Sequence, residues 1–260
     1  MIVISAGMPK AGTAWYYQMT NDLLVAAGFQ DAGGVREKFH LDTIMLYETN
    51  SVGGSWISQH LLLIPHLMGH SFAIKTHKPP QRMFRLWEAA NIAKSTYVFR
   101  DPRDAALSAY EHGQRLLARG RRGTFAQLTT LEDAIVKAQE WLFVWQQWMD
   151  YGRALVVRYE DLLLNTTVEL QRLAMHLSLS VGVGIMEDIV NRYKAENVSA
   201  LPPEKGKLHF NKGITGRFRQ VMTTQQQQMC QDLLGAYLIK MGYDEHSCSN
   251  LPPVNVPPLK

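Results

Sequence analysis

The chain of 260 residues is 46% hydrophobic and shows no break in composition, which predicts a single domain with one sizeable core. No apolar stretch approaches ~18 residues, and the first residues lack a basic segment followed by an apolar run, so neither a membrane span nor a signal peptide is expected. The net charge of +4 is modest, and we expect neither nucleic acid nor a membrane as a partner. Two cysteines, Cys230 and Cys248, give no disulfide framework and no zinc spacing, which favours a cytoplasmic location.

The first stretch of the chain, residues 2–15, reads as a short β-branched strand, a Gly/Pro loop with one lysine, and the start of a helix. Apolar residues then recur every four positions from Trp15 to Ala27, and Gly28 is placed to end this helix. Backbone N–H groups at a helix N-terminus lack intrahelical partners, and Lys10 adds a positive charge beside them. The loop is therefore predicted to hold a phosphate.

The kind of phosphate follows from what this loop lacks. Gly7 and Gly12 have the separation found in a Walker A loop, G-x-x-x-x-G-K-[ST]. However, Thr13 stands at the position of the lysine and Ala14 at that of the hydroxyl that binds Mg²⁺, which argues against an ordinary Mg·ATP site. Taken alone, the segment could be a chance glycine-rich turn. It resembles the P-K-x-G-T-x-W loop with which sulfotransferases grip the 5′-phosphosulfate of 3′-phosphoadenosine 5′-phosphosulfate (PAPS): Pro9, Lys10, Ala11, Gly12, Thr13, Ala14 and Trp15.

Residues 29–70 are irregular, with turn signals at 33–34 and 53–54. They fit either loops that cover the core or a segment that lines a substrate site. His66 and His70 lie four residues apart, but no third ligand stands nearby to favour a metal site.

A second strand is predicted over residues 71–75 and is followed by a double proline at 79–80 that halts regular structure. His77 then lies just past the C-terminal end of a strand, where open α/β sheets place their ligands. A structural role is the alternative for a single histidine. The segment Lys75-Thr76-His77 resembles the K-T-H segment of the same sulfotransferases, in which the histidine is the general base.

Residues 96–99 form a third predicted strand, and a helix that carries Ser108 follows it. Part of this pattern is structural, because Pro102 near a helix start and Asp104 in its first turn are ordinary initiation signals. Arg100 at the strand end and Ser108 about two turns into the helix are able to converge on one anion. The stretch resembles the family's R-[DN]-P-[RK]-D-x-x-x-S element, which binds the 3′-phosphate of PAPS.

Residues 131–148 keep a helical period, and we assign the tryptophans in it to the core. Residues 154–159 form a fourth predicted strand. Tyr159 to Leu162 resembles the family's Y-E-D-L, in which the tyrosine lies near the adenine.

The remaining local signals concern helix ends. A last helix is predicted to close at Gly242, before a proline-rich tail over 243–260. The spacing of Thr and Glu or Gln predicts two capping boxes: Thr166 with Glu169, and Thr224 with Gln227. The densest basic cluster fits a solvated helix end, with a dedicated anion patch as the alternative: Arg115, Arg119, Arg121 and Arg122.

Residues 195–220 read as a loop, and within it 210–218 resembles the family's R-K-G-x-x-G-x-W. Lys212 and Gly213 match, whereas Asn211 replaces the arginine that contacts the 3′-phosphate and Phe218 replaces the tryptophan. The site must either bind PAPS more weakly or recruit a substitute cation, and we favour the second. The candidate substitutes are Lys212, Arg217, Arg219, Arg115 and Arg119.

Together the five segments follow the family's order over residues 1–242. The resemblance implies an α/β fold in a single sulfotransferase domain, residues 1–260, with a central parallel sheet flanked by helices in a P-loop or nucleotide-kinase-like three-layer sandwich. It also implies PAPS as the co-substrate, leaving as adenosine 3′,5′-bisphosphate (PAP), with no metal.

The resemblance also assigns roles. His77 takes the acceptor's proton, Lys10 neutralises the leaving group and Lys75 supports the sulfuryl oxygens. Thr13 and backbone N–H groups hold the 5′-phosphate, and Trp15 stacks on the adenine. The acceptor is expected to be a small molecule or a carrier-bound intermediate, bound by His77 together with parts of 39–60 and 110–150. Two rival classes stay open: a P-loop kinase of small molecules and a non-catalytic nucleotide-binding protein.

Overall fold

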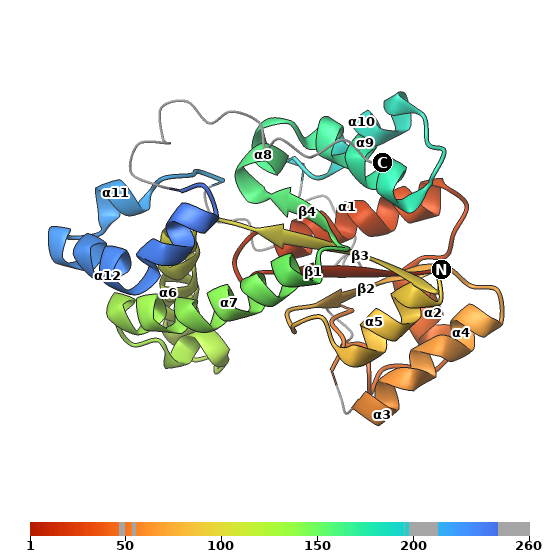
Figure 1. The fold of residues 1–260 in the computed structure, drawn as a ribbon, viewed down its shortest axis with the longest axis horizontal. Coiled ribbons are helices and arrows are strands. Elements are labelled where there is room, and N and C mark those ends of the chain that lie inside the picture. Colours follow the sequence, from red (N-terminus) through yellow and green to blue (C-terminus); the bar gives the residue numbers. More distant parts are fainter. Residues whose placement is uncertain (47–49, 54–55, 195, 198–212, 244–260) are drawn as a thin grey trace. The chain divides into compact units, whose positions relative to one another are not determined.

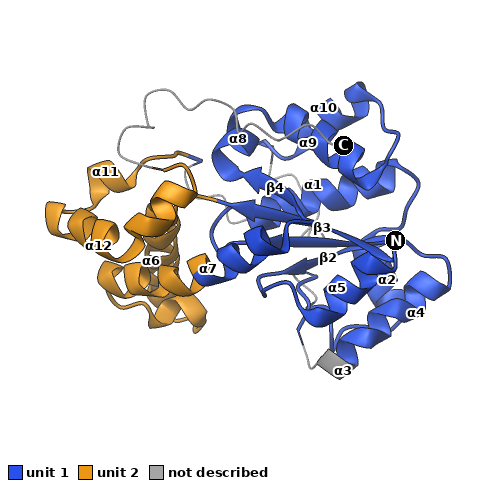
Figure 2. Ribbon diagram, in the orientation of Figure 1, with its two compact units in different colours: residues 1–99, 143–213 blue, residues 100–142, 214–260 orange. Residues whose placement is uncertain are grey.

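The structure is a computed structural model that describes residues 1–46, 50–53, 56–194, 196–197 and 213–243. The chain groups into two compact units, which Figure 2 distinguishes by colour. Unit 1 comprises residues 1–99 and 143–213, and unit 2 comprises residues 100–142 and 214–260. The single domain and the boundary of the tail stay predictions, and residues 244–260 lie outside the described part.

Unit 1 contains a parallel sheet whose order is β2-β1-β3-β4. The register pairs Ile4 of β1 with Ile74 of β2 and with Ser95 of β3. Because all strands run in the same direction, their C-terminal ends lie at one edge of the sheet. The strands of the described residues are β1 (Ile2–Gly7), β2 (Phe72–Thr76), β3 (Ala93–Phe99) and β4 (Leu155–Arg158).

Helices cover both faces of this sheet. In Figure 1, α1, α9 and α10 lie on one side and α4 and α5 on the other. The predicted α/β class, with a parallel sheet flanked by helices, is therefore confirmed. The helices of this unit include α1 (Thr13–Ala26), α2 (Ala32–Lys38), α3 (Trp56–Gln59), η1 (His60–Leu62), α4 (Leu63–Leu67), α5 (Arg82–Ala89), α8 (Tyr159–Leu164), α9 (Thr166–Leu177) and α10 (Val183–Arg192).

Unit 2 is helical in its described part. Its helix α6 packs against η2, α11 and α12. The helix α7 begins in unit 2 and continues into unit 1 after Leu142. The bounds of these elements are α6 (Pro102–Ala118), η2 (Thr124–Gln127), α7 (Leu131–Tyr151), α11 (Phe218–Val221) and α12 (Thr224–Lys240).

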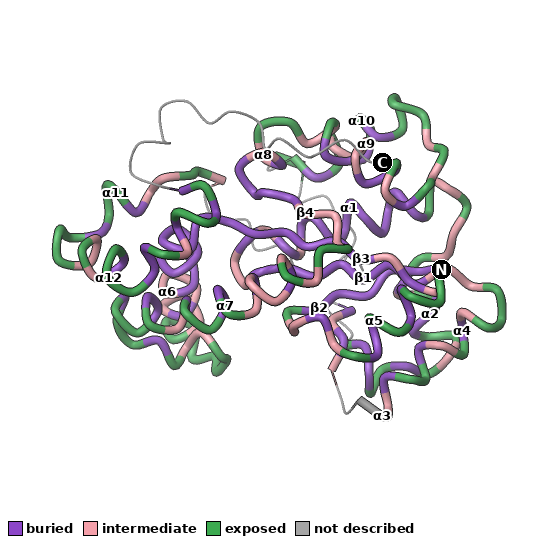
Figure 3. The backbone as a smooth tube through the Cα atoms, viewed as in Figure 1, coloured by how far each residue is buried: buried purple, intermediate pink, exposed green. Residues whose placement is uncertain are grey.

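The core of unit 1 lies along the sheet, and Figure 3 shows buried backbone through β1 and β3. The tryptophan assignment is confirmed for Trp148, which is fully buried and stacks on Tyr97 of β3 with ring centroids 5.6 Å apart. No helix in the described ranges is both long enough and apolar enough to cross a bilayer.

Several strand and helix ends differ from the prediction. The strand β2 runs one residue later than expected, so that His77 follows it directly. The strand β3 begins earlier, at Ala93, and so includes the half-buried Lys94 and the fully buried Ser95. Tyr159 is not the end of a strand but the first residue of α8, whose first turn carries Glu160 and Asp161 as a helix start favours.

Both predicted capping boxes were wrong. Thr166 is the first residue of α9, and its hydroxyl donates to the carbonyl of Leu162 in α8 at 2.8 Å. Glu169 pairs with Arg172 instead. The box of α12 exists one residue earlier than predicted, between Thr223 and Gln226. By contrast, the predicted end of α1 is confirmed: Gly28 has a φ of 87° and its N–H closes the last turn.

Candidate active site

The loop between β1 and α1 has an unusual backbone. Lys10 adopts a φ of 66° and Gly12 a φ of 71°, both in the left-handed region. Such a conformation is uncommon for a lysine and is found mostly where a functional geometry requires it. Gly12 cannot be replaced without strain, because a Cβ there would also lie 2.7 Å from the ring of Tyr159.

The N-terminus of α1 has a glycine at its N-cap position, Gly12, which carries no side chain to accept from the first amides of the helix. Lys10 is half-buried in the same loop. This combination of uncapped amides and one ammonium group is the arrangement predicted for the 5′-phosphosulfate.

His77 lies beside this loop. Its Nδ1 is 2.7 Å from the carbonyl oxygen of Gly7, the last residue of β1. A carbonyl oxygen only accepts, so Nδ1 carries the proton and donates it, which leaves Nε2 of the neutral ring with a lone pair. The sequence predicted His77 as a base, and this contact determines which nitrogen would act.

The electrostatics of His77 favour the neutral ring. Burial, followed by the charges of Lys75 and Lys10, lowers its pKa to about 4. The residue keeps an exposed surface, but protein atoms crowd the ring and both lysines are near enough to oppose its protonation. His77 is therefore unprotonated near neutral pH and able to accept a proton.

Lys75 is deeply buried in β2, and burial lowers its pKa to about 8. No carboxylate of the described residues offsets this shift. Its backbone is held on two sides, by Ser5 of β1 and by a bridge to Ser51, with the Lys75 N–H donating to the Asn50 carbonyl at 3.1 Å. Part of the segment predicted to line the acceptor pocket therefore runs beside Lys75, while residues 47–49 and 54–55 lie outside the described part.

One supporting residue was missed from the sequence. The indole Nε1 of Trp148 donates to the carbonyl of Lys78 at 3.0 Å, and the Lys78 N–H donates to the Thr76 hydroxyl at 3.1 Å. These bonds hold the chain on either side of His77. The helical period marked Trp148 only as a core residue, because a pattern of apolar spacing carries no signal for an indole hydrogen bond.

The two residues predicted near the adenine lie together. Trp15 and Tyr159 meet edge to face with ring centroids 6.4 Å apart, and the Tyr159 ring also lies against Gly12. The pair brings one predicted motif, the loop, next to another that is separated from it by more than a hundred residues in sequence.

In unit 2, Arg100 lies two residues before the first residue of α6 and Ser108 about two turns into that helix, and both are buried. The Arg100 guanidinium is held by two oxygens through Nη2: the Ile214 carbonyl at 2.9 Å and the Asp104 carboxylate at 3.3 Å. Asp104 is thus more than a helix-initiation signal, because it pairs with a predicted cofactor ligand.

The residues around the motif 210–218 are partly described. Asn211 and Lys212 lie outside the described part, and Gly213 has a φ of 59°. Phe218, at the position of the family's tryptophan, is buried, with the guanidinium carbon of Arg103 4.0 Å and that of Arg219 4.5 Å from its ring centroid. An aromatic ring is therefore retained between two cations.

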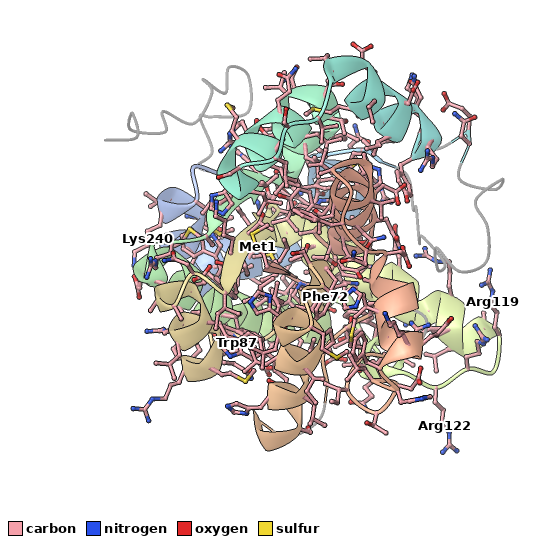
Figure 4. All side chains as sticks on the ribbon, turned by 90° about the vertical axis from the view of Figure 1, so that its right-hand side faces the viewer. Met1, Phe72, Trp87, Arg119, Arg122 and Lys240 are labelled. Atoms are coloured by element: carbon pink, nitrogen blue, oxygen red, sulfur yellow. The ribbon has the colours of Figure 1, made fainter. Side chains whose placement is uncertain are left out.

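The candidate substitutes for the missing arginine differ in their surroundings. Arg217 is committed to Glu111 through two hydrogen bonds of 2.6 and 3.1 Å, which raise its pKa, so it is poorly placed to serve a phosphate. Arg119 and Arg122 extend away from the ribbon in Figure 4 and are exposed, as expected for a solvated helix end. The described residues contain no group of three or more His, Cys, Asp or Glu side chains arranged for a metal ion.

The fold is an α/β sheet with helices on both faces, and a comparison with known families identifies the class of the protein. The profile of the sulfotransferase domain matches residues 2–242. The chain belongs to the sulfotransferase family, as its motifs predicted.

Individual relatives are distant. A luciferin sulfotransferase of Photinus pyralis is 25% identical over 210 residues, and the match covers 75% of this chain but only 56% of that relative. Among solved structures, a mouse sulfotransferase complexed with PAP has a TM-score of 0.59 at 16% identity, covering 91% of this chain and 83% of that one. A retinol dehydratase in complex with retinol and PAP has a TM-score of 0.58 at 15% identity, covering 91% and 81%. Likeness at this level shows a shared fold.

Proposed function

We propose that this protein transfers a sulfuryl group from PAPS to an oxygen or nitrogen of an acceptor and releases PAP. The observation that carries the proposal is the gathering of Lys10, Lys75 and His77 beside the uncapped start of α1. Membership of the sulfotransferase family supports it. Three groups that carry or accept a proton, next to the first backbone amides of a helix, suit a reaction in which negative charge passes between oxygens.

Each of the assigned residues of unit 1 has its own role in the reaction. His77 Nε2 accepts the proton of the attacking hydroxyl or amine, because Nδ1 is already committed to the Gly7 carbonyl. Lys10 neutralises the charge that develops on the bridging oxygen as the S–O bond to the phosphate breaks. Lys75 supports the sulfuryl oxygens, and the amides at Thr13 hold the 5′-phosphate. The new bond joins sulfur to the acceptor atom, so the charge moves without a metal being required.

The residues of unit 2 are assigned to the 3′-phosphate of the cofactor. We assign the 3′-phosphate to Arg100 and Ser108, a guanidinium and a hydroxyl that follow β3 in one short stretch of sequence. Trp15 and Tyr159 of unit 1 are assigned to the adenine.

The class of acceptor is suggested by the name of a relative. The luciferin sulfotransferase is named for a small molecule. For this chain we likewise propose a small-molecule or carrier-bound acceptor.

The test is transfer of label from ³⁵S-PAPS to a panel that contains one phenol, one aliphatic alcohol and one amine. The proposal expects labelled acceptor and PAP in equal amounts from at least one class, and a rate at least ~10²-fold lower from the His77→Ala variant. Binding of PAP without transfer to any class would favour the non-catalytic nucleotide-binding protein. Turnover of Mg·ATP in place of PAPS would favour the small-molecule kinase.

A further inference from the structure

We propose that Asp104 is a positioning residue for the 3′-phosphate site, holding Arg100 and the backbone of residues 214–218 in one geometry. This inference rests on the proposed function, because it assumes that Arg100 meets the 3′-phosphate. The sequence pattern indicates for Asp104 only the ordinary role of an acidic residue in the first turn of a helix.

The contacts of Asp104 go well beyond its own helix. Its Oδ2 accepts from the Gly216 N–H at 2.6 Å and from Arg100 Nη2 at 3.3 Å, and its Oδ1 accepts from the Phe218 N–H at 3.0 Å. Gly216 and Phe218 stand at the last two specified positions of the motif 210–218, the second of which is a tryptophan in the family. One carboxylate therefore joins two cofactor motifs that are more than a hundred residues apart in sequence.

Because Asp104 is buried, its carboxylate depends on these contacts. The residue is 2% exposed, and a buried carboxylate is costly unless its oxygens are well satisfied. Here the three donors supply that satisfaction, and two of them are backbone groups of the loop. Because those donors are backbone N–H groups, the bonds fix the path of the main chain rather than the identity of the side chains.

The same network orients Arg100. Its Nη2 is shared between the Asp104 carboxylate and the Ile214 carbonyl, so two acceptors on one side set the plane of the guanidinium. A guanidinium has five donors in a fixed fork, and fixing its plane directs the remaining donors. Arg100 thus reaches an anion in an orientation that Asp104 and the loop determine.

The isosteric variant Asp104→Asn has two opposite effects on the binding of PAP, one from the loss of charge and one from the loss of positioning. The change removes a negative charge next to a phosphate site, so electrostatics alone would tighten the binding of PAP. It also places an amide NH₂ where a backbone N–H and Arg100 both need an acceptor, which disrupts the positioning. We expect the second effect to dominate: calorimetric affinity for PAP falls about tenfold or more, while affinity for adenosine 5′-phosphate stays within about threefold.

Two further variants separate positioning from stability. Asp101→Asn is the matched control, because Asp101 is also buried at the start of α6, where its carboxylate pairs with Arg103 and caps the helix. It should lower the melting temperature without changing the preference for PAP. Asp104→Glu keeps the charge but moves the carboxylate by one methylene, and it should also lose affinity for PAP.

The outcomes are distinct. Unchanged or tighter binding of PAP by Asp104→Asn would overturn the inference and leave the proposed function intact. So would an equal loss of PAP affinity in Asp101→Asn, since the effect would then follow from a weakened helix. Equal affinity of the parent protein for PAP and for adenosine 5′-phosphate would overturn the 3′-phosphate assignment of the proposed function and this inference together.

Discussion

The basic side chains at the predicted chemical centre of unit 1 and those beside the predicted 3′-phosphate site of unit 2 have different surroundings. In unit 2 the arginines beside the predicted 3′-phosphate site are paired with carboxylates: Arg100 with Asp104, Arg103 with Asp101, and Arg217 with Glu111. In unit 1 burial lowers the pKa of Lys75 to about 8, with no carboxylate of the described residues opposing the shift. Burial and neighbouring lysines lower that of His77 to about 4.

The difference matches two kinds of task. A paired guanidinium keeps its charge at any physiological pH and has a fixed orientation, which suits recognition of a constant anion. A histidine that is crowded by cations stays neutral and is ready to accept a proton, which suits the chemical step. We therefore expect changes in unit 1 to affect turnover and changes in unit 2 to affect the affinity for the cofactor.

The largest effect is expected at His77. Because Nε2 of His77 is the proposed base, His77→Ala should lower kcat by ~10²- to 10⁴-fold and leave the dissociation constant of PAP unchanged. The control is His66→Ala, since His66 contacts the terminal amine at the start of β1, at the other edge of the sheet. A turnover of His77→Ala within a few-fold of the parent would remove the base from the account.

A somewhat smaller loss is expected at Lys10. Lys10→Ala should lower kcat by ~10²- to 10³-fold, the range found when one group that stabilises developing negative charge is removed. Its effect on the KM of the acceptor should be small. EDTA should leave the parent's activity unchanged; loss of activity with EDTA and recovery with Mg²⁺ would replace this lysine-based account with a metal-dependent one.

In unit 2 the effect should fall on binding. Arg100→Ala should weaken the binding of PAP by ~1.5 to 3 kcal/mol, the worth of a charge-assisted hydrogen bond, and leave adenosine 5′-phosphate almost unaffected. Titration calorimetry with both nucleotides measures this directly. A variant that lost affinity for both nucleotides equally would show a general defect and not a 3′-phosphate contact.

The smallest effect concerns stability. Lys75→Met should raise the free energy of unfolding at pH 7 by ~1 to 3 kcal/mol, because it removes a buried, uncompensated charge, and it should lower turnover. The pKa of Lys75 is lower in the folded state than in the unfolded chain, so the folded parent binds fewer protons and gains stability as pH rises from about 8 to 10.5. The advantage of the variant should therefore shrink over that window, as measured by urea unfolding. An advantage that is constant with pH would mean that the charge of Lys75 is not its source.

The strands and the first helix could be predicted because β-branched runs and four-residue spacing encode them locally, as Gly28 at the end of α1 shows. The ends of helices were harder to predict from sequence, since the Thr166 hydroxyl donates to Leu162 of the preceding helix α8 and Glu169 pairs with Arg172. The motifs predicted which side chains gather. They could not reveal the Gly7 carbonyl that fixes the His77 tautomer, because a backbone acceptor has no signature in sequence.

The central claim, that chemistry belongs to unit 1 and recognition of the 3′-phosphate to unit 2, is tested most directly with two donors. Steady-state kinetics are measured for the unaltered protein with PAPS and with adenosine 5′-phosphosulfate, which lacks the 3′-phosphate. The ratio of the two kcat/KM values measures what recognition of the 3′-phosphate adds to the chemical step. We predict that kcat/KM is at least about tenfold higher with PAPS, despite Asn211, and that Arg100→Ala removes most of this preference. Equal kcat/KM for the two donors would contradict the account.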